Sequence, residues 1–204
     1  MPAILTALAL LVALERPAVT LVLCDIPGAL LGGSGNTLRA EVSTLLAGAG
    51  LAIRWREVAP GRSFENGGGE IPVILLPSDL RNHGGERVLG LVIGNHRFPS
   101  PIWISVPNVR WVVGVQDADA GTRRLAVERA LGRVIAHEVV HAFAPEHPHA
   151  ALGLMGRSVN KRLLTGEAGF LDQDCLSAVA RALRSPELRS QVSGPPLVAL
   201  TGSR

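Results

Sequence analysis

Residues 137–149 read HEVVHAFAPEHPH, and the rest of the sequence is interpreted outward from this stretch. It contains the pattern H-E-x-x-H, formed by His137, Glu138 and His141. Residues four apart on an α-helix share one face, so both histidines of the pattern can approach the same point. The helix is expected to end before Pro145, because the residue preceding a proline is pushed out of the α region. Two more histidines follow beyond that end.

The chemistry of these side chains points to a metal ion. Neutral imidazoles are common ligands of Zn²⁺, and three of them leave a fourth position for water. Glu138 comes next to the first histidine, beside the ion but not bound to it, where it can accept a proton from that water. The alternative is an ordinary helix with solvated histidines, but buried histidines on a helix with an apolar flank would be costly without a partner. We therefore predict a Zn²⁺ site with His137 and His141 as ligands and Glu138 as general base.

The third ligand stays open when the residues alone are considered. His147 and His149 both follow the end of the helix and are separated by Pro148. Residues i and i+2 of an extended segment face the same way, so the chain could present either histidine to the metal. Glu146 is a further candidate, with a carboxylate in place of an imidazole.

The stretch resembles the signature of the metzincin clan of zinc peptidases, H-E-x-x-H-x-x-G-x-x-H followed by a turn that contains a methionine. His137, Glu138, His141 and His147 match the signature, and Met155 in Gly-Leu-Met matches the turn methionine. By this resemblance His147 would be the third ligand, and Met155 would lie beneath the metal as a hydrophobic floor.

One position departs from the signature, because Ala144 stands where the signature has glycine. Glycine permits a left-handed turn that returns the third histidine to the metal, whereas alanine adopts such a turn at a cost of about 1 kcal/mol. Residues 88–155 also resemble a group of small bacterial metzincin-like proteins. Their third histidine has the spacing that His149 shows here, six residues before Met155. We therefore expect His149 as third ligand and keep His147 as the alternative.

The resemblance covers most of residues 18–183, although it is specific only in the zinc stretch. It implies an α/β (α+β) fold with a mixed twisted sheet, a long active-site helix, a backing helix and a C-terminal helix. It also implies that residues 88–93 form an edge strand beside the cleft, which could pair with an extended peptide. Some members of the clan place a tyrosine near the metal, but this chain has no tyrosine. Oxyanion stabilisation would then come from the metal and other donors.

The remaining sequence predicts elements that suit this fold. Apolar or alternating runs favour strands, and amphipathic spacing between capping and stop signals favours helices. The predicted strands are 18–24, 51–58, 71–76, 88–93 and 102–106, and the valine-rich segment 109–115 is predicted to be extended. The predicted helices are 38–47, capped by Asn36 or Thr37, 122–143, capped by Asp117 or Asp119, and 168–183.

Composition narrows the class of protein further. The 204 residues are 47% hydrophobic and carry a formal net charge of +3, which suits one domain with a sizeable core. The arginines are scattered and form no basic stripe, so we expect no nucleic-acid partner. Residues 3–14 form an apolar run that is too short to span a bilayer but has the length of a signal-peptide core. No Lys or Arg precedes it, and no clear cleavage site follows.

We accordingly divide the chain into three parts. Residues 1–17 are a signal peptide or another apolar N-terminal segment, residues 18–184 are the catalytic domain, and residues 185–204 are a loose tail. A cleaved leader would make the protein secreted or periplasmic, and otherwise it would be cytoplasmic. Cys24 and Cys175 could form one disulfide in an exported protein or remain two separate buried thiols.

Other residues that could carry chemistry have simpler interpretations. His83 and His96 are isolated loop histidines, expected at the surface. The three tryptophans, Trp55, Trp103 and Trp111, suit core or cleft packing. Glu167 lies downstream of the motif, as a glutamate ligand does in thermolysin-like enzymes, but its glycine-rich surroundings are a poor helix context for that role.

The function predicted from the sequence is that of a zinc-dependent metallopeptidase acting on peptide or protein substrates. No stable membrane span is expected, and the oligomeric state is not predicted. One alternative is a non-catalytic, zinc-stabilised peptide-binding domain, and another is a zinc hydrolase of a non-peptide amide. Glu138 argues against the binding domain, because a structural zinc site has no use for a base and usually has four protein ligands.

Overall fold

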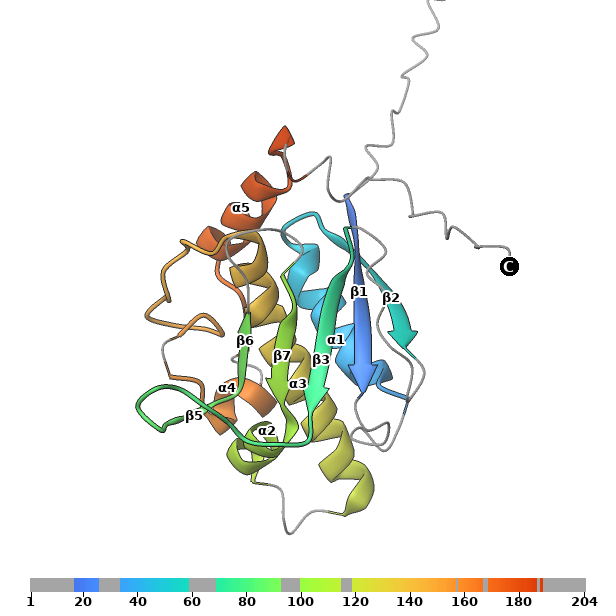
Figure 1. Cartoon of the computed structure of the whole chain (residues 1–204), viewed down its shortest axis with the longest axis vertical. Helices are drawn as coiled ribbons and strands as arrows, with labels where there is room; N and C mark the ends of the chain where they lie inside the picture. The colour runs from blue at the N-terminus through green and yellow to red at the C-terminus, as the bar shows by residue number, and fades with distance from the viewer. Residues whose placement is uncertain are drawn as a thin grey trace, which may run out of the picture.

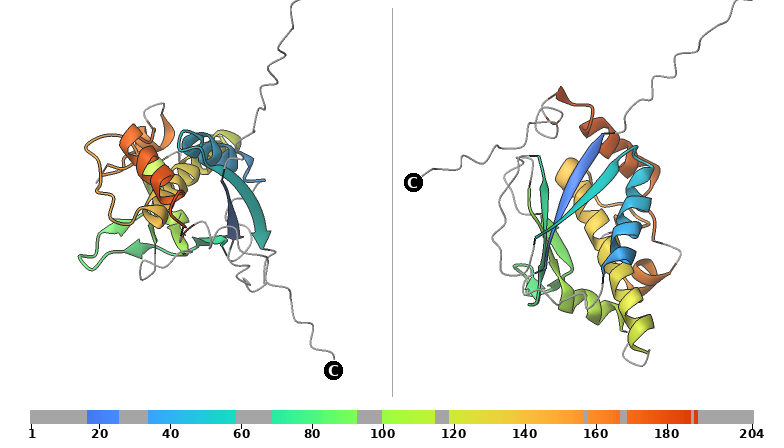
Figure 2. Two further views of the ribbon diagram at one scale, coloured as in Figure 1. Left: turned by 90° about the horizontal axis from the view of Figure 1, so that it is seen from above. Right: turned by 90° about the vertical axis from the view of Figure 1, so that its right-hand side faces the viewer.

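A computed structural model describes residues 17–25, 34–58, 69–92, 100–114, 119–156, 158–166, 169–186 and 188. Its main feature is a five-stranded sheet with the order β2-β1-β3-β7-β6, covered on one face by helices α1 and α3 (Figures 1 and 2). β6 runs antiparallel to β7, whereas the other neighbouring strands are parallel. The predicted α/β fold with a mixed sheet is therefore confirmed.

The described part of the chain forms short strands and helices, of which α3 is the longest helix. The strands of the main sheet are β1 (Ala18–Asp25), β2 (Ala52–Val58), β3 (Ile71–Leu76), β6 (Gly90–Val92) and β7 (Ile102–Ser105). Strands β4 (Leu80–Arg81) and β5 (Arg87–Val88) form a separate two-stranded sheet. The helices are α1 (Asn36–Ala47), α2 (Val106–Val113), α3 (Ala120–Phe143), α4 (Lys161–Thr165) and α5 (Gln173–Ala182). The first three predicted strands agree with the structure to within one residue at each end.

Helix α3 is the long helix that the sequence predicts, and it begins two residues earlier than expected. The side chain of Asp119 caps it by accepting a hydrogen bond of 2.9 Å from the backbone N–H of Thr122. The helix packs against β6 and β7 and against α1. Its second half therefore lies behind the edge of the sheet that β6 forms (Figure 1).

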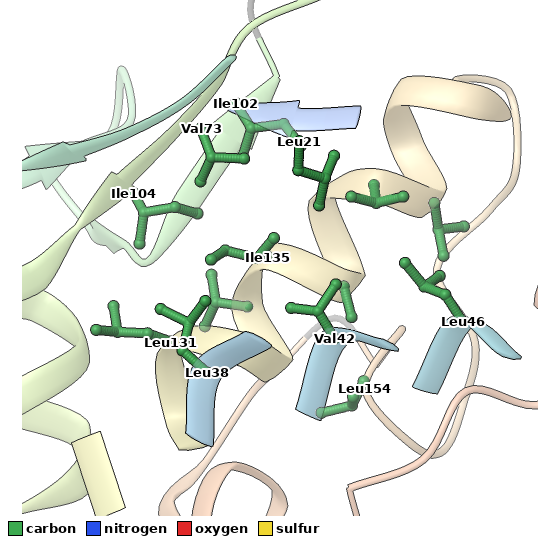
Figure 3. Packing of buried hydrophobic residues seen from close by; sticks show 14 of the residues in the cluster. Leu21, Leu38, Val42, Leu46, Val73, Ile102, Ile104, Leu131, Ile135 and Leu154 are labelled. Carbon is green, nitrogen blue, oxygen red and sulfur yellow. The ribbon is translucent and has the colours of Figure 1, made fainter. Parts of the chain in front are cut away.

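The core fills the space between the sheet and these two helices (Figure 3). Leu21 and Ile102 from the sheet, Leu38 from α1 and Ile135 from α3 are all fully buried there. Gly132 permits the close approach of the helices, since a Cβ atom at this position would lie 2.8 Å from the carbonyl oxygen of Leu38. The core thereby fixes the position of the helix that carries the H-E-x-x-H pattern.

The prediction of an extended segment at 109–115 is wrong, because most of it belongs to α2. Ser105 caps this helix by accepting a hydrogen bond from the N–H of Asn108, and Gly114 ends it in the left-handed conformation, with φ of 57°. Three of its valines, Val106, Val109 and Val113, are buried. Caps at both ends and packing against α3 outweigh the β preference of valine.

Other boundaries also differ from the predictions. The strand expected at 88–93 is divided between β5, which pairs with β4, and β6, which pairs with β7. α1 has Gly35 as its N-cap, without a side-chain hydrogen bond, so neither Asn36 nor Thr37 caps it. α4 lies in a segment for which no helix was predicted, and α5 begins after Asp172, five residues later than predicted.

Several predictions concern residues outside the described part of the chain. These are the apolar run 3–14, Asp117, His96, Glu167 and most of the tail from 185 onward. Among the described residues, no helix is both long enough and apolar enough to cross a bilayer. Cys24 and Cys175 are described, and they are two free, buried thiols with no disulfide between them.

Candidate metal centre

Helix α3 and the segment after it bring three histidines together. His137 and His141 lie one helical turn apart, with ring centroids separated by 4.8 Å. The ring of His149 lies 5.4 Å from the first and 4.9 Å from the second. One ring nitrogen from each of the three lies within 4.8 Å of the others. His147 does not join this group.

The spacing of the ring nitrogens suits a zinc ion. Nε2 of His137 lies 3.2 Å from Nε2 of His141. Zinc–nitrogen bonds of about 2.0–2.1 Å in a tetrahedral site place two ligand nitrogens roughly 3.3–3.4 Å apart. Nδ1 of His137 lies 2.7 Å from the carbonyl oxygen of Leu154, which has no proton, so the ring nitrogen donates this bond. The tautomer is thereby fixed with Nε2 available as a ligand.

Burial keeps the two helix histidines in the neutral form that binds metals. It lowers the pKa of His137, and it lowers the pKa of His141 to about 4, with further lowering by the neighbouring His137 and His149. His149 is exposed, so the group opens to solvent on its side. A cluster of three imidazoles with one open side has the donor set of a zinc site that retains a position for water.

Glu138 lies next to this cluster and is buried. Burial raises the pKa of its carboxyl group to about 8, so the group can exchange a proton near neutral pH. The side chain packs closely under the edge strand, because a Cβ atom on Gly90 would lie 2.9 Å from Oε1 of Glu138. Gly90 therefore leaves the space in which the carboxylate lies.

The exit from α3 explains which histidine reaches the cluster. Ala144 ends the helix with φ of −134° and ψ of 70°, a conformation that does not require glycine. The left-handed turn expected from a glycine at this position is absent. The N–H of His147 donates to the carbonyl oxygen of Ala144 at 2.9 Å, and its side chain contacts Cys175 of α5. His149 is the downstream histidine that the chain returns to the helix.

The segment around Met155 supports the cluster from the other side. Met155 is 1% exposed and belongs to the core, and the residue before it contacts His137. The N–H of Ala150 donates to the carbonyl oxygen of Met155 at 2.8 Å, and the N–H of Leu154 donates to that of Phe170 at 2.9 Å. These bonds hold the segment after His149 in a defined loop.

An open cleft of about 900 Å³ lies in front of the cluster. Its walls include β6, the residues of the H-E-x-x-H pattern and His149. Trp111 lines the cleft and is 64% exposed, with the guanidinium carbon of Arg87 4.6 Å from its ring centroid. The sequence predicted a role in core or cleft packing for Trp111 but gave no indication of Arg87, whose partner is distant in the chain.

The other sequence candidates lie apart from the cluster. His83 and Glu146 are exposed, and Glu146 is in neither of the two groups of potential metal ligands within the described residues. Trp55 and Trp103 are half-buried in strands. The second of these groups consists of His147, Asp172 and Cys175.

The fold is similar to that of two solved structures. Archaemetzincin from Methanopyrus kandleri superposes with a TM-score of 0.57 at 13% identity, over 84% of this chain and 98% of that chain. A zinc-dependent peptidase from Methanocorpusculum labreanum superposes with a TM-score of 0.53 at 13% identity, over 78% of this chain and 99% of that chain. No protein-family model and no curated protein matches the sequence. At this identity the likeness establishes a shared fold.

Proposed function

We propose that the protein is a zinc-dependent metallopeptidase, with His137, His141 and His149 as zinc ligands and Glu138 as general base. The observation that carries the proposal is the convergence of three imidazoles beside a buried carboxylate in an open cleft. The fold shared with archaemetzincin and with a zinc-dependent peptidase supports the same activity.

The roles of the residues follow from their positions. Zinc in this site would supply a water molecule with a pKa near 7 and would polarise the carbonyl group under attack. Glu138 is adjacent to His137 on α3, so its carboxylate can accept the proton of the attacking water and pass it to the leaving amine. The charge of a bound Zn²⁺ would lower the pKa of Glu138 from its raised metal-free value, so that the carboxylate needed as a base is available. The Leu154 carbonyl keeps Nε2 of His137 directed at the zinc position.

The edge strand supports an extended peptide as substrate. In the described part of the sheet β6 pairs with β7 alone, and residues of β6 line the cleft. A peptide could add to this edge through main-chain hydrogen bonds, which hold an extended chain independently of its side chains. Such pairing would position a peptide bond in the cleft that Glu138 lines.

Replacement of Glu138 tests the proposal. Glu138→Gln and Glu138→Ala are expected to retain one zinc per chain and to lose peptide hydrolysis by a factor of about 10²–10⁴. Glu86→Gln is the matched control, because Glu86 also lines the cleft and lies outside the histidine cluster. Full activity in the Glu138 variants would exclude this residue as base. Zinc in the wild type without hydrolysis of any peptide in a library would instead favour a zinc-stabilised binding domain.

A further inference from the structure

We propose that Cys175 positions the third zinc ligand, by holding His147 out of the zinc site so that His149 is presented to it. This inference rests on the proposed zinc site and assigns a role to a cysteine from a different helix. Cys175 touches neither zinc nor substrate and acts through His147.

The contact joins two segments that are distant in the chain. Nε2 of His147 lies 3.1 Å from Sγ of Cys175, which is in the first turn of α5 and is 0% exposed. The position of the thiol is itself fixed, because the N–H of Cys175 donates to Oδ1 of the N-cap residue Asp172 at 2.8 Å. The imidazole of His147 is therefore anchored to a rigid helix end.

The thiol of Cys175 is suited to donating a hydrogen bond. Burial raises the pKa of Cys175 to about 12, and a hydrogen bond with Asp172 contributes to the rise, so the sulfur keeps its proton at neutral pH. The protonated thiol can donate a hydrogen bond to Nε2 of His147.

The distance between Nε2 of His147 and Sγ of Cys175 distinguishes a direct contact from joint binding of a second metal ion. His147, Asp172 and Cys175 have ligand atoms within 4.8 Å of one another, as a metal site would. In tetrahedral coordination, zinc bonds of about 2.0–2.1 Å to nitrogen and 2.3 Å to sulfur would place the nitrogen and sulfur roughly 3.6 Å apart. The observed 3.1 Å between His147 and Cys175 is that of a direct contact. By the same geometry, His137 and His141 have nearly the separation of two zinc ligands.

The contact between His147 and Cys175 restrains His149, because His147 lies only two residues before it in the chain. On the other side of His149, the N–H of Ala150 is fixed by the carbonyl oxygen of Met155. Between the two anchors lie only Pro148, whose ring restricts φ, and His149 itself. A ligand held between two fixed points loses less conformational freedom on binding, which favours metal affinity.

The experiment is a double-mutant cycle read out by zinc affinity, measured on the full chain by competition with a chelator. Cys175→Ala and His147→Ala are each expected to weaken zinc binding about tenfold, as supporting residues of metal sites do. The double variant is expected to be no weaker than either single variant, because both remove the same contact. Cys175→Ser, which keeps a hydrogen-bonding group, should recover most of the affinity. Cys24→Ala is the matched control, since Cys24 is a buried free thiol on β1, and should bind zinc like the wild type.

Each outcome decides between distinct explanations. Zinc affinities of Cys175→Ala and His147→Ala within twofold of the wild type would overturn the positioning role and leave the zinc site intact. Two zinc ions per wild-type chain and one in Cys175→Ala would overturn it in favour of a second metal site. Zinc binding that survives His149→Ala and is lost in His147→Ala would contradict the ligand assignment on which the inference rests.

Discussion

Nδ1 of His137 lies 2.7 Å from the carbonyl oxygen of Leu154, which links the face of α3 that carries His137 and His141 to the loop before Met155. The bond fixes the histidine tautomer and the ring orientation through a backbone atom. A change of the Leu154 side chain would leave its carbonyl group in place. The hydrogen bond to His137 is therefore best tested by replacing Met155, which packs this loop into the core.

Met155→Ala should destabilise the protein by about 2–5 kcal/mol, because it removes a buried side chain and leaves a cavity. It should also weaken zinc binding about tenfold as the Leu154 carbonyl moves away from His137. Met155→Leu conserves volume and should cost less than about 1.5 kcal/mol with zinc affinity retained. Denaturant unfolding and chelator competition measure the two quantities. Equal zinc affinity in Met155→Ala and the wild type would remove the proposed support of His137 by this loop.

Gly90→Ala should impair catalysis more than zinc binding. The added Cβ atom would lie 2.9 Å from Oε1 of Glu138 and 2.8 Å from Cδ1 of Ile104, so these side-chain ends must move. Because Glu138 is the proposed base and not a ligand, we expect peptide hydrolysis to fall at least about tenfold while one zinc per chain is retained. Steady-state kinetics together with metal analysis check this. Loss of zinc from Gly90→Ala would show that the edge strand supports the ligands instead.

Glu138 should make the zinc-free protein less stable as the pH rises. The folded-state pKa of about 8 lies above the ordinary value of 4.5, so the folded state binds more protons than the unfolded state between these values. The free energy of unfolding therefore falls as the pH rises from 4.5 towards 8, by on the order of 3 kcal/mol at pH 7. Glu138→Gln should be more stable than the wild type at pH 7, with a difference that disappears below pH 4.5.

Urea unfolding of the chelator-treated wild type and Glu138→Gln across this pH range measures that difference. The comparison cancels the titration of the histidines, which is common to both proteins. A difference that does not change with pH would mean that the carboxyl group is solvated and ionised in the folded protein.

Gly132→Ala should destabilise the fold although alanine is the better helix former. The Cβ atom would lie 2.8 Å from the backbone oxygen of Leu38, so α1 and α3 would have to separate. We expect a loss of about 1–3 kcal/mol, larger than the roughly 1 kcal/mol gained in helix propensity. Thermal unfolding of the two proteins is the measurement, and a more stable Gly132→Ala would contradict the close packing of these helices.

The sequence predicted the parts of the fold that local patterns determine. β3 is a continuous apolar run, and α3 combines a cap at Asp119 with a long amphipathic pattern. In both cases propensity, burial and boundary signals agree, so the element can be recognised without knowledge of its partners. The zinc stretch was recognisable for the same reason, since its residues belong to one helix and the loop after it.

The errors arose where distant contacts decide the structure. The valines of α2 favour a strand locally, and packing on α3 makes them a buried helix face. β4 and β5 are only two residues each, so no periodic pattern could indicate them. Gly35 acts as N-cap of α1 without a side-chain hydrogen bond, and the N–H of Thr37 instead donates a hydrogen bond to Oε2 of Glu128 in α3.

The choice between His147 and His149 as third ligand also depends on contacts that are distant in the chain. The signature pattern favoured His147, whereas the alanine at position 144 and the spacing of six residues from His149 to Met155 favoured His149. The backbone at Ala144 and the contact between His147 and Cys175 account for the arrangement. The contact could not be predicted from the sequence, because the two residues are 28 positions apart.

The most direct test is zinc-dependent hydrolysis by the purified wild-type protein. A chelator should remove one zinc per chain and abolish cleavage of a peptide library, and one equivalent of added zinc should restore it. Cleavage that continues in metal-free protein, or a protein that neither contains zinc nor binds it when added, would contradict a three-histidine zinc site as the source of activity.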